Sequence, residues 1–276
     1  MSITEQSATS PRPERTVPRI GLYIIGDEIL SGRRQDKHFS KMVELLGARG
    51  LKLAWAQFLG DDRAELVAAL RRSFASGDIV FSCGGIGATP DDHTRQAAAE
   101  ALGEPLVLHP EARQLIAERS AEMADKGQGS ADMETPENRQ RLQMGMFPAS
   151  AEIVANPYNR IPGFYVRNHT FMPGFPVMAW PMMEAMLDTR YADLHHREAW
   201  AEHSFLVFDM PESRITPAMV EIERRWPDVR AFSLPSVGEG SAPHIDLGVK
   251  GEPQAAAEAL QWLQNEVTRL GGRLGN

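Results

Sequence analysis

The sequence predicts an α/β protein: a mostly parallel sheet covered by helices on both faces, followed by a small α+β domain. Short apolar segments rich in β-forming residues alternate with helical patterns over residues 19–103. A glycine-rich loop joins one of these predicted strands to the helix that follows it. After residue 196 the order becomes strand, helix, strand, strand, helix, which is typical of a two-layer α+β unit.

Composition limits the classes of protein that this chain can be. Its 276 residues are enough for two domains, and 42% of them are hydrophobic, which is enough for a core. The net charge of −8 argues against broad nucleic-acid binding. No apolar run approaches the roughly 20 residues that a membrane helix needs, and residues 1–18 lack the apolar stretch of a signal peptide, so we expect a disordered lead. Cys83 is the single cysteine, which excludes a disulfide framework, and the chain is expected to be cytoplasmic.

The first half of the chain alternates strand and helix. Strands are predicted where apolar, β-forming residues cluster, and helices where apolar residues recur at helical spacing. Two acidic residues, Asp61 and Asp62, open the second helix, where they favour the helix dipole. The predicted strands are 19–25, 51–58 and 78–83. The predicted helices are 36–50, one that begins at residues 61–62 and includes Phe74, and 95–103.

The pattern loosens after residue 104. Helices are predicted over 110–127 and from Thr135, with Pro136 in the first turn, and turns are predicted over 151–166. A strand over 170–174 precedes an apolar helix over 176–187, in which Pro181 is expected in the first turns. The methionines of this helix are predicted to form core or a subunit contact.

A domain boundary is predicted near residues 189–196, between a domain over 19–190 and a second over 197–272. The second domain has its own alternation of apolar and polar residues. Its predicted strands are 204–210, 229–235 and 243–250, and its predicted helices are 216–226 and 254–270. It contains no pattern of residues that points to catalysis.

The loop from Ser82 to Thr94 is the strongest candidate site. Gly84, Gly85 and Gly87 allow positive φ and close approach of a ligand, and the helix start behind them attracts an anion. Asp91 and Asp92 place two carboxylates beside this anion site, which is favourable if a metal or a transferred proton lies between them. The alternative is that the glycines only turn the chain and that an aspartate only caps the helix.

A second acidic motif follows the first predicted strand. Gly26, Asp27 and Glu28 lie at its carboxyl end, where open α/β sheets bind ligands. We therefore expect both motifs to meet at one edge of the sheet.

Taken together, the order and spacing of five motifs resemble the molybdopterin-binding domain of the competence/damage-inducible protein A family. The stretch Val166–Asn168 looks closest to the molybdopterin-binding half of FAD synthases, and the domain is also similar to the molybdopterin adenylyltransferases. The motifs are Gly26–Gly32, Asp36, Gly60–Asp62, Gly84–Thr94 and Met172–Pro176.

The resemblance implies a three-layer fold with a pterin-phosphate pocket at the carboxyl ends of the strands, and a KH-like second domain. It implies catalytic and metal-binding roles for Asp36 and Asp92, with a divalent ion such as magnesium. The ligand-binding residues that it implies are Gly26, Asp27, Glu28, Gly84, Gly85, Gly87, Thr89, Asp91 and Thr94. Homo-oligomers are expected, and neither nucleic acid nor a membrane is an expected partner.

The implied function is binding of molybdopterin or a related pyrophosphate-bearing ligand in molybdenum cofactor handling. The alternatives are metal-dependent cleavage of nucleotide pyrophosphates such as ADP-ribose or FAD, adenylyl transfer, and a degenerate domain that only binds. The chain departs from many relatives at Lys37 and His38, where they have Thr-Asn or Ser-Asn. These residues are expected either to favour a more acidic ligand or to be solvated residues of a helix start.

Overall fold

The computed structural model describes residues 18–196, 201–238 and 242–275. The chain divides into two units, residues 1–197 and 198–276, which are described separately. All but the last residue of the predicted lead over 1–18 lies outside the described residues. None of the described helices is long and apolar enough to cross a membrane.

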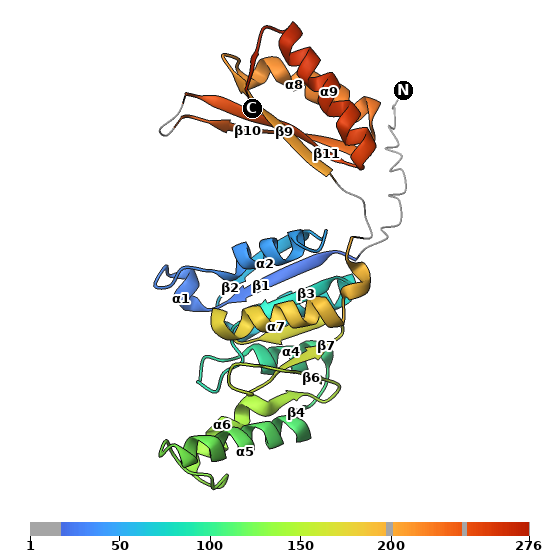
Figure 1. The fold of residues 1–276 in the computed structure, drawn as a ribbon. Helices are drawn as coiled ribbons and strands as arrows, with labels where there is room; N and C mark the ends of the chain where they lie inside the picture. The colour runs from blue at the N-terminus through green and yellow to red at the C-terminus, as the bar shows by residue number, and fades with distance from the viewer. Residues whose placement is uncertain (1–17, 197–200, 239–241, 276) are drawn as a thin grey trace, which may run out of the picture. The chain divides into compact units, whose positions relative to one another are not determined.

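The first unit is built on a six-stranded sheet with the order β2-β1-β3-β8-β7-β6 (Figure 1). Strands β2, β1, β3 and β8 are parallel to one another, and β7 is antiparallel to both β8 and β6. Strands β4 and β5 form a separate antiparallel pair. The strands are Ile20–Ile25 (β1), Leu53–Leu59 (β2), Ile79–Cys83 (β3), Leu106–Leu108 (β4), Met146–Pro148 (β5), Glu152–Val154 (β6), Gly163–Val166 (β7) and His169–Met172 (β8).

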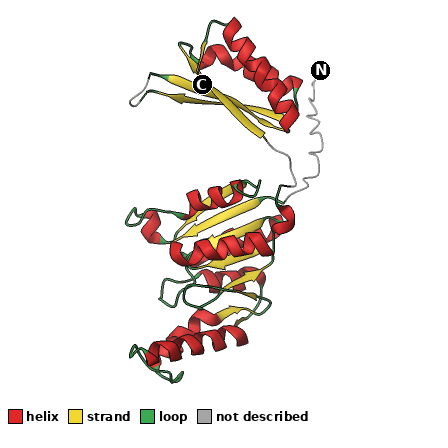
Figure 2. Cartoon of the chain, in the orientation of Figure 1, coloured by secondary structure: helices red, strands yellow, loops and turns green. Residues whose placement is uncertain are grey.

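Helices cover both faces of this sheet (Figure 2). Successive side chains of β1 point to opposite faces, so Leu22 and Ile24 pack with α2 and α7, whereas Tyr23 and Ile25 pack with α3 and α4. This confirms the α/β fold with a mostly parallel sheet. The helices of the unit are Asp27–Leu30 (α1), His38–Gly47 (α2), Arg63–Ser76 (α3), Thr94–Leu102 (α4), Pro110–Asp125 (α5), Pro136–Leu142 (α6) and Pro176–Thr189 (α7), with short 3₁₀ helices at Gln143–Gly145 and Ala192–Leu194.

Local sequence signals set several helix ends. The Asp62 side chain caps α3 by accepting a hydrogen bond from the amide of Glu65 at 2.9 Å. This cap adds to its predicted favourable effect on the helix dipole. Gly77 and Gly103 end α3 and α4 in the left-handed conformation, with φ of 74° and 71°.

Two local predictions differ from the structure. Residues 151–166, predicted as turns, contain the short strands β6 and β7. Their three and four residues are too few to produce an alternating pattern. The helical spacing of Phe39, Met42, Val43 and Leu46 predicts one apolar face for the helix over 36–50, but Phe39 and Val43 are each 45% exposed, because Met42, Leu45 and Leu46 fill the core. Pro181 is the sixth residue of α7 and lies within its first two turns, as predicted.

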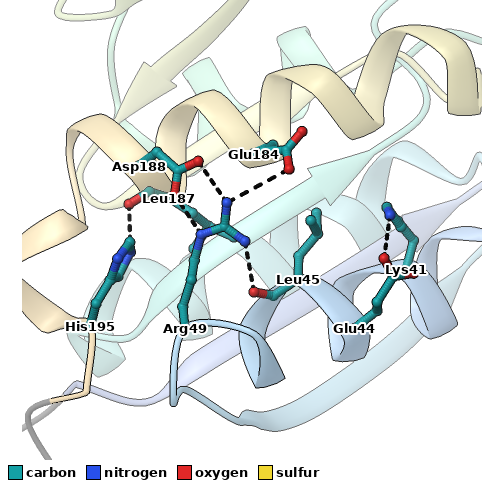
Figure 3. A network of polar contacts seen from close by, with 8 residues as sticks. All are labelled: Lys41, Glu44, Leu45, Arg49, Glu184, Leu187, Asp188 and His195. Carbon is teal, nitrogen blue, oxygen red and sulfur yellow. Dashed lines mark hydrogen bonds and ion pairs between the residues drawn. The ribbon is translucent and has the colours of Figure 1, made fainter.

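Arg49 joins the end of α2 to α7 (Figure 3). Its guanidinium donates two parallel hydrogen bonds to Asp188, at 2.5 and 2.6 Å, and one to the carbonyl of Leu45 at 2.9 Å. The paired hydrogen bonds lower the pKa of Asp188. Since both helices begin next to the candidate site, this planar contact at their far ends fixes their spacing there.

The second unit is a four-stranded antiparallel sheet with the order β10-β11-β9-β12 and two helices packed on it. The predicted order of strands and helices is present, and a short final strand, β12, is added. Its elements are Ala201–Phe208 (β9), Glu212–Arg225 (α8), Val229–Ser236 (β10), His244–Gly251 (β11), Pro253–Arg269 (α9) and Arg273–Gly275 (β12).

Candidate functional site

A cavity of about 420 Å³ opens at the carboxyl ends of β1 and β3. Its volume lies within the range of small-molecule sites. The lining is apolar at the strand ends and polar or charged at the start of α2. The lining residues are Ile24, Ile25, Glu28, Ile29, Arg34, Gln35, Asp36, Lys37, His38, Cys83, Gly174, Phe175 and Pro176.

The connections of the sheet explain why the cavity lies there. From β1 the chain proceeds to β2 on one side, and from β3 it proceeds to β8 on the other side. The helices that follow these two strands therefore lie on opposite faces, which leaves a crevice between the strand ends. Ile24 and Ile25 end β1 and Cys83 ends β3, so the cavity occupies this crevice.

Cys83 contributes a neutral wall to the cavity. The side chain is 1% exposed, and burial, reinforced by the charge of Asp36, raises the pKa of its thiol. A thiol in this environment remains protonated and is a poor nucleophile.

Of the predicted site residues, Glu28 and Asp36 line the cavity. Asp36 also caps α2: one carboxylate oxygen accepts from the amide of His38 at 2.8 Å and the other from the amide of Phe39 at 3.0 Å. The carboxylate thus satisfies two of the free amides at this helix start.

His38 is a buried part of the cavity wall and not a solvated residue. It is 4% exposed, and its Nε2 lies 3.1 Å from the carbonyl oxygen of Gly174. Because a carbonyl only accepts, Nε2 is the donor. His38 therefore connects the start of α2 to the turn before α7, two walls of the cavity. Its Nδ1 is buried and has no hydrogen-bond partner within the described ranges.

The glycine-rich loop is held by contacts within the protein. Asp92 accepts hydrogen bonds from the amides of Gly87 and Thr89, each at 2.9 Å, and from the Thr89 hydroxyl. The amide of Gly84 donates to the backbone carbonyl of Met172 at 3.0 Å. These three amides are already used, so a phosphate that bound to them would have to displace protein acceptors.

The positions of the loop glycines also have a structural cause. A Cβ on Gly84 would lie 2.1 Å from the carbonyl oxygen of Ile25, and a Cβ on Gly85 would lie 2.1 Å from the Thr94 hydroxyl. Gly84 and Gly85 have φ of 110° and 68°, which disfavour other residues. Both the sterics and the backbone angles require glycine without any ligand.

Arg95 is a buried side chain that holds the glycine-rich loop in place. It is 2% exposed, and its guanidinium donates to the carbonyl of Gly87. Burial lowers the pKa of Arg95 to about 10, against the opposing effect of Asp92. The amide of Gly87 donates to Asp92, and the carbonyl of Gly87 accepts from Arg95. Both backbone polar groups of Gly87 are therefore held by side chains.

Asp61 is a residue of this edge that the sequence interpretation assigned only to the helix dipole. Its carboxylate accepts from the amide of Asp27 at 2.9 Å, and the Asp27 carboxylate accepts from the amide of Asp61 at 3.2 Å. Partial burial raises the pKa of Asp61, and the charges of Asp27, Glu28 and Asp91 raise it further, although the Asp27 amide opposes this. The signal that could have revealed Asp61 is its position directly after β2, at the carboxyl edge of the sheet.

The carboxylates do not form a ready metal site. Both oxygens of Asp36 accept from amides at the start of α2, and both oxygens of Asp92 accept from amides of the glycine-rich loop. The described residues contain no group of three or more His, Cys, Asp or Glu side chains that could hold a metal ion. Divalent ions need several oxygen ligands at once. The arrangement does not fit the divalent ion expected between these two residues.

The first unit matches a known family model, described as the probable molybdopterin binding domain, over residues 21–193. A CinA-like protein from Anaeromyxobacter sp. is 31% identical over 245 residues, which cover 82% of this chain and 57% of that protein. A CinA-like protein from Geobacter metallireducens is 30% identical over 267 residues, which cover 93% of this chain and 60% of that protein. This chain thus spans less than two thirds of the length of either relative.

A solved structure has the same fold. The protein CinA from Thermoplasma acidophilum, of unknown function, aligns with a TM-score of 0.52 and 26% identity. The alignment covers 62% of this chain and 97% of that one.

Proposed function

The chain belongs to the family of the probable molybdopterin binding domain, and on this premise we propose that it binds a molybdopterin-type ligand that carries phosphate or pyrophosphate, in the handling of the molybdenum cofactor. The position of the cavity carries this proposal. It lies at the point where the strand order reverses, which is where open α/β sheets bind ligands.

The charges around the cavity suggest which residues meet the phosphate. Arg34 and Lys37 line it and are exposed, whereas the amides of Gly87 and Thr89 already donate to Asp92. Cations at a cavity rim can bind a phosphate without breaking a bond in the protein fold. We therefore assign the phosphate to Arg34 and Lys37, and give the loop the role of holding the neighbouring backbone in place.

Binding is favoured over metal-dependent hydrolysis by the hydrogen bonds of Asp36 and Asp92. Both carboxylates already accept hydrogen bonds from backbone amides, and among the described residues neither joins a group of three His, Cys, Asp or Glu side chains that could hold a metal ion. The predicted ligand-binding roles of Gly26, Asp27, Glu28 and Asp91 remain part of this proposal.

The test is recovery of the ligand from the full chain. The protein is purified from cells that make molybdenum cofactor, and bound pterin is released, oxidised to a fluorescent product and quantified by mass spectrometry. We expect pterin in the wild type and about tenfold less in the charge-reversal variant Lys37→Glu, the scale of a lost charge-assisted hydrogen bond. Arg33→Glu is the matched control, because it changes the net charge equally and Arg33 does not line this cavity.

A parallel assay addresses the hydrolase alternative. The protein is incubated with magnesium and either ADP-ribose or FAD, and AMP is measured. Release of AMP, together with the absence of bound pterin, would replace the binding proposal with nucleotide pyrophosphate cleavage.

A further inference from the structure

Phe175 is an aromatic side chain held out of the core at the cavity wall. It is 52% exposed, whereas Phe81, Phe164 and Phe171 of the same unit are fully buried. Phe175 immediately precedes α7, where its carbonyl accepts from the amides of Met178 and Ala179, each at 2.9 Å. The carbonyl before it, that of Gly174, accepts from His38. The backbone on both sides is therefore fixed, so the ring is presented to the cavity from a rigid support.

Within the described part of the chain, the Phe175 ring contacts Arg34, a cation that can move away. The guanidinium carbon of Arg34 lies 5.8 Å from the centre of the Phe175 ring. The Arg34 side chain is 61% exposed, and its ion pair with Glu28 is long, at 3.9 Å. A cation–π contact and an ion pair at such exposed sites are both weak. A ligand can thus take the ring face at little cost, and Arg34 stays close enough to meet a phosphate.

The other walls suit a flat ring. Ile24, Ile25 and Ile29 supply an apolar floor, and Cys83 adds a neutral thiol. Lys37 and Arg34 supply positive charge at the rim. An apolar slot with an aromatic wall and a basic rim is complementary to a planar aromatic ring attached to a phosphate.

We infer that Phe175 is the specificity-determining residue of this cavity: its ring stacks on a planar nitrogen heterocycle, and phosphate compounds that lack such a ring bind weakly. This rests on the proposed function and adds to it the group that selects the ligand. The heterocycle can be a pterin or a purine, since both offer a flat π face.

The test measures what the heterocyclic ring adds to the affinity, apart from what the phosphate groups contribute. Calorimetry on the full chain measures the affinities of inorganic pyrophosphate, 6-hydroxymethylpterin diphosphate and ADP for the wild type, Phe175→Ala and the control Phe39→Ala. Phe39 is also exposed, at 45%, but does not line the cavity. We expect at least one ring compound to bind the wild type about tenfold or more tightly than pyrophosphate, and this advantage to disappear in Phe175→Ala alone, the scale of one stacked base.

Each outcome decides a different point. An advantage for the pterin compound alone identifies a pterin slot, and an advantage for ADP alone identifies a purine slot; both support stacking on Phe175. Equal affinities of pyrophosphate and the ring compounds for the wild type, or a ring advantage that survives in Phe175→Ala, overturn the inference and leave the phosphate site in place. Absence of binding by all three compounds overturns the proposed function together with this inference.

Discussion

At the residue scale, the loop glycines are constrained by the protein itself. The missing Cβ of Gly85 would meet the Thr94 hydroxyl, and the missing Cβ of Gly87 would lie 2.5 Å from an Asp92 oxygen. From the sequence, these glycines were expected to make room for a ligand. The structure adds a second cause, close packing of the loop on the start of α4, and the two causes make different predictions.

We expect Gly85→Ala to destabilise the protein, because the new Cβ would overlap Thr94 and φ is 68°. The expected loss of unfolding free energy is about 2 kcal/mol or more. In the double variant Gly85→Ala/Thr94→Ala the hydroxyl is gone, so urea unfolding should show a smaller loss than the sum of the single variants. Wild-type stability of Gly85→Ala with loss of pterin binding would instead favour the role in ligand approach.

Asp92 gives a second prediction at this scale. Removing its carboxylate in Asp92→Ala leaves the amides of Gly87 and Thr89 without their acceptor. The free energy of unfolding should fall by about 1–2 kcal/mol, the scale of buried or partly buried amides left without an acceptor. Its neighbour Asp91 is exposed and serves as the control, since Asp91→Ala should change stability by less than about 0.5 kcal/mol. Equal stability of the two variants would show that the hydrogen bonds of Asp92 to the loop are unimportant for stability.

Because of the buried His169, we expect the free energy of unfolding to depend on pH. It is buried, its Nδ1 donates to the carbonyl of Arg167 at 2.8 Å, and its Nε2 lies 2.7 Å from the Ser73 hydroxyl. Burial lowers the pKa of His169 to about 4 from the model-compound value of 6.5. Below pH 6.5 the unfolded chain therefore binds a proton that the folded protein excludes.

The stability that the neutral ring contributes is fully present above pH 6.5 and is lost as the pH falls towards 4, by up to about 3 kcal/mol. Urea unfolding between these values should show a shallower decline for His169→Gln than for the wild type. Carboxylates titrate in both proteins, so the difference between the two curves is the measure. Parallel curves would show that His169 is not the group responsible.

At the scale of elements, the structure decides the role of the Met-rich helix α7. Met182, Met183 and Met186 are buried in the cluster that packs α7 and α2 on the sheet. Of the two roles predicted for these residues, the core role is the one that the structure shows. The predicted homo-oligomer therefore gains no support from them and stays a prediction.

The variant Met183→Ala distinguishes a core role of this residue from a role in a subunit contact. Since Met183 is 0% exposed, the substitution should lower the free energy of unfolding by about 2–5 kcal/mol and leave the mass measured by light scattering unchanged. Val177→Ala, on the same helix and 52% exposed, should have an effect below about 0.5 kcal/mol. A change of mass in Met183→Ala at unchanged stability would place this residue in a subunit contact.

At the scale of the whole molecule, charge limits the partners. The chain carries a net charge of −8, and the second unit, despite its resemblance to a KH-like module, has no Gly-x-x-Gly clamp with basic neighbours in its sequence. RNA binding would require cations along a groove, because the phosphate backbone supplies most of the affinity.

We therefore expect no retention of a single-stranded RNA by the full chain at physiological ionic strength. A filter-binding titration at two salt concentrations is the measurement. Binding that weakens steeply with added salt would contradict this prediction and assign the second unit a nucleic-acid role.

Local signals are enough to predict many of the elements. The short apolar segments 19–25 and 78–83 indicate buried strands, Asp62 marks a helix start and Gly103 a helix end, because these signals depend on neighbours within a few residues. The sequence also placed Glu28 at the carboxyl end of the first strand, and the family resemblance implied a site role for Asp36. Both residues line the cavity.

The contacts of these residues depend on the tertiary structure. It joined Asp27 to Asp61 and His38 to Gly174, pairs separated by 34 and 136 residues. It used the Asp36 carboxylate at the start of α2 and the Asp92 carboxylate to hold the glycine-rich loop. It also exposed Phe175 at the cavity. Such contacts depend on which strands become neighbours, and strand order is set by the packing of whole helices on the sheet rather than by any local pattern.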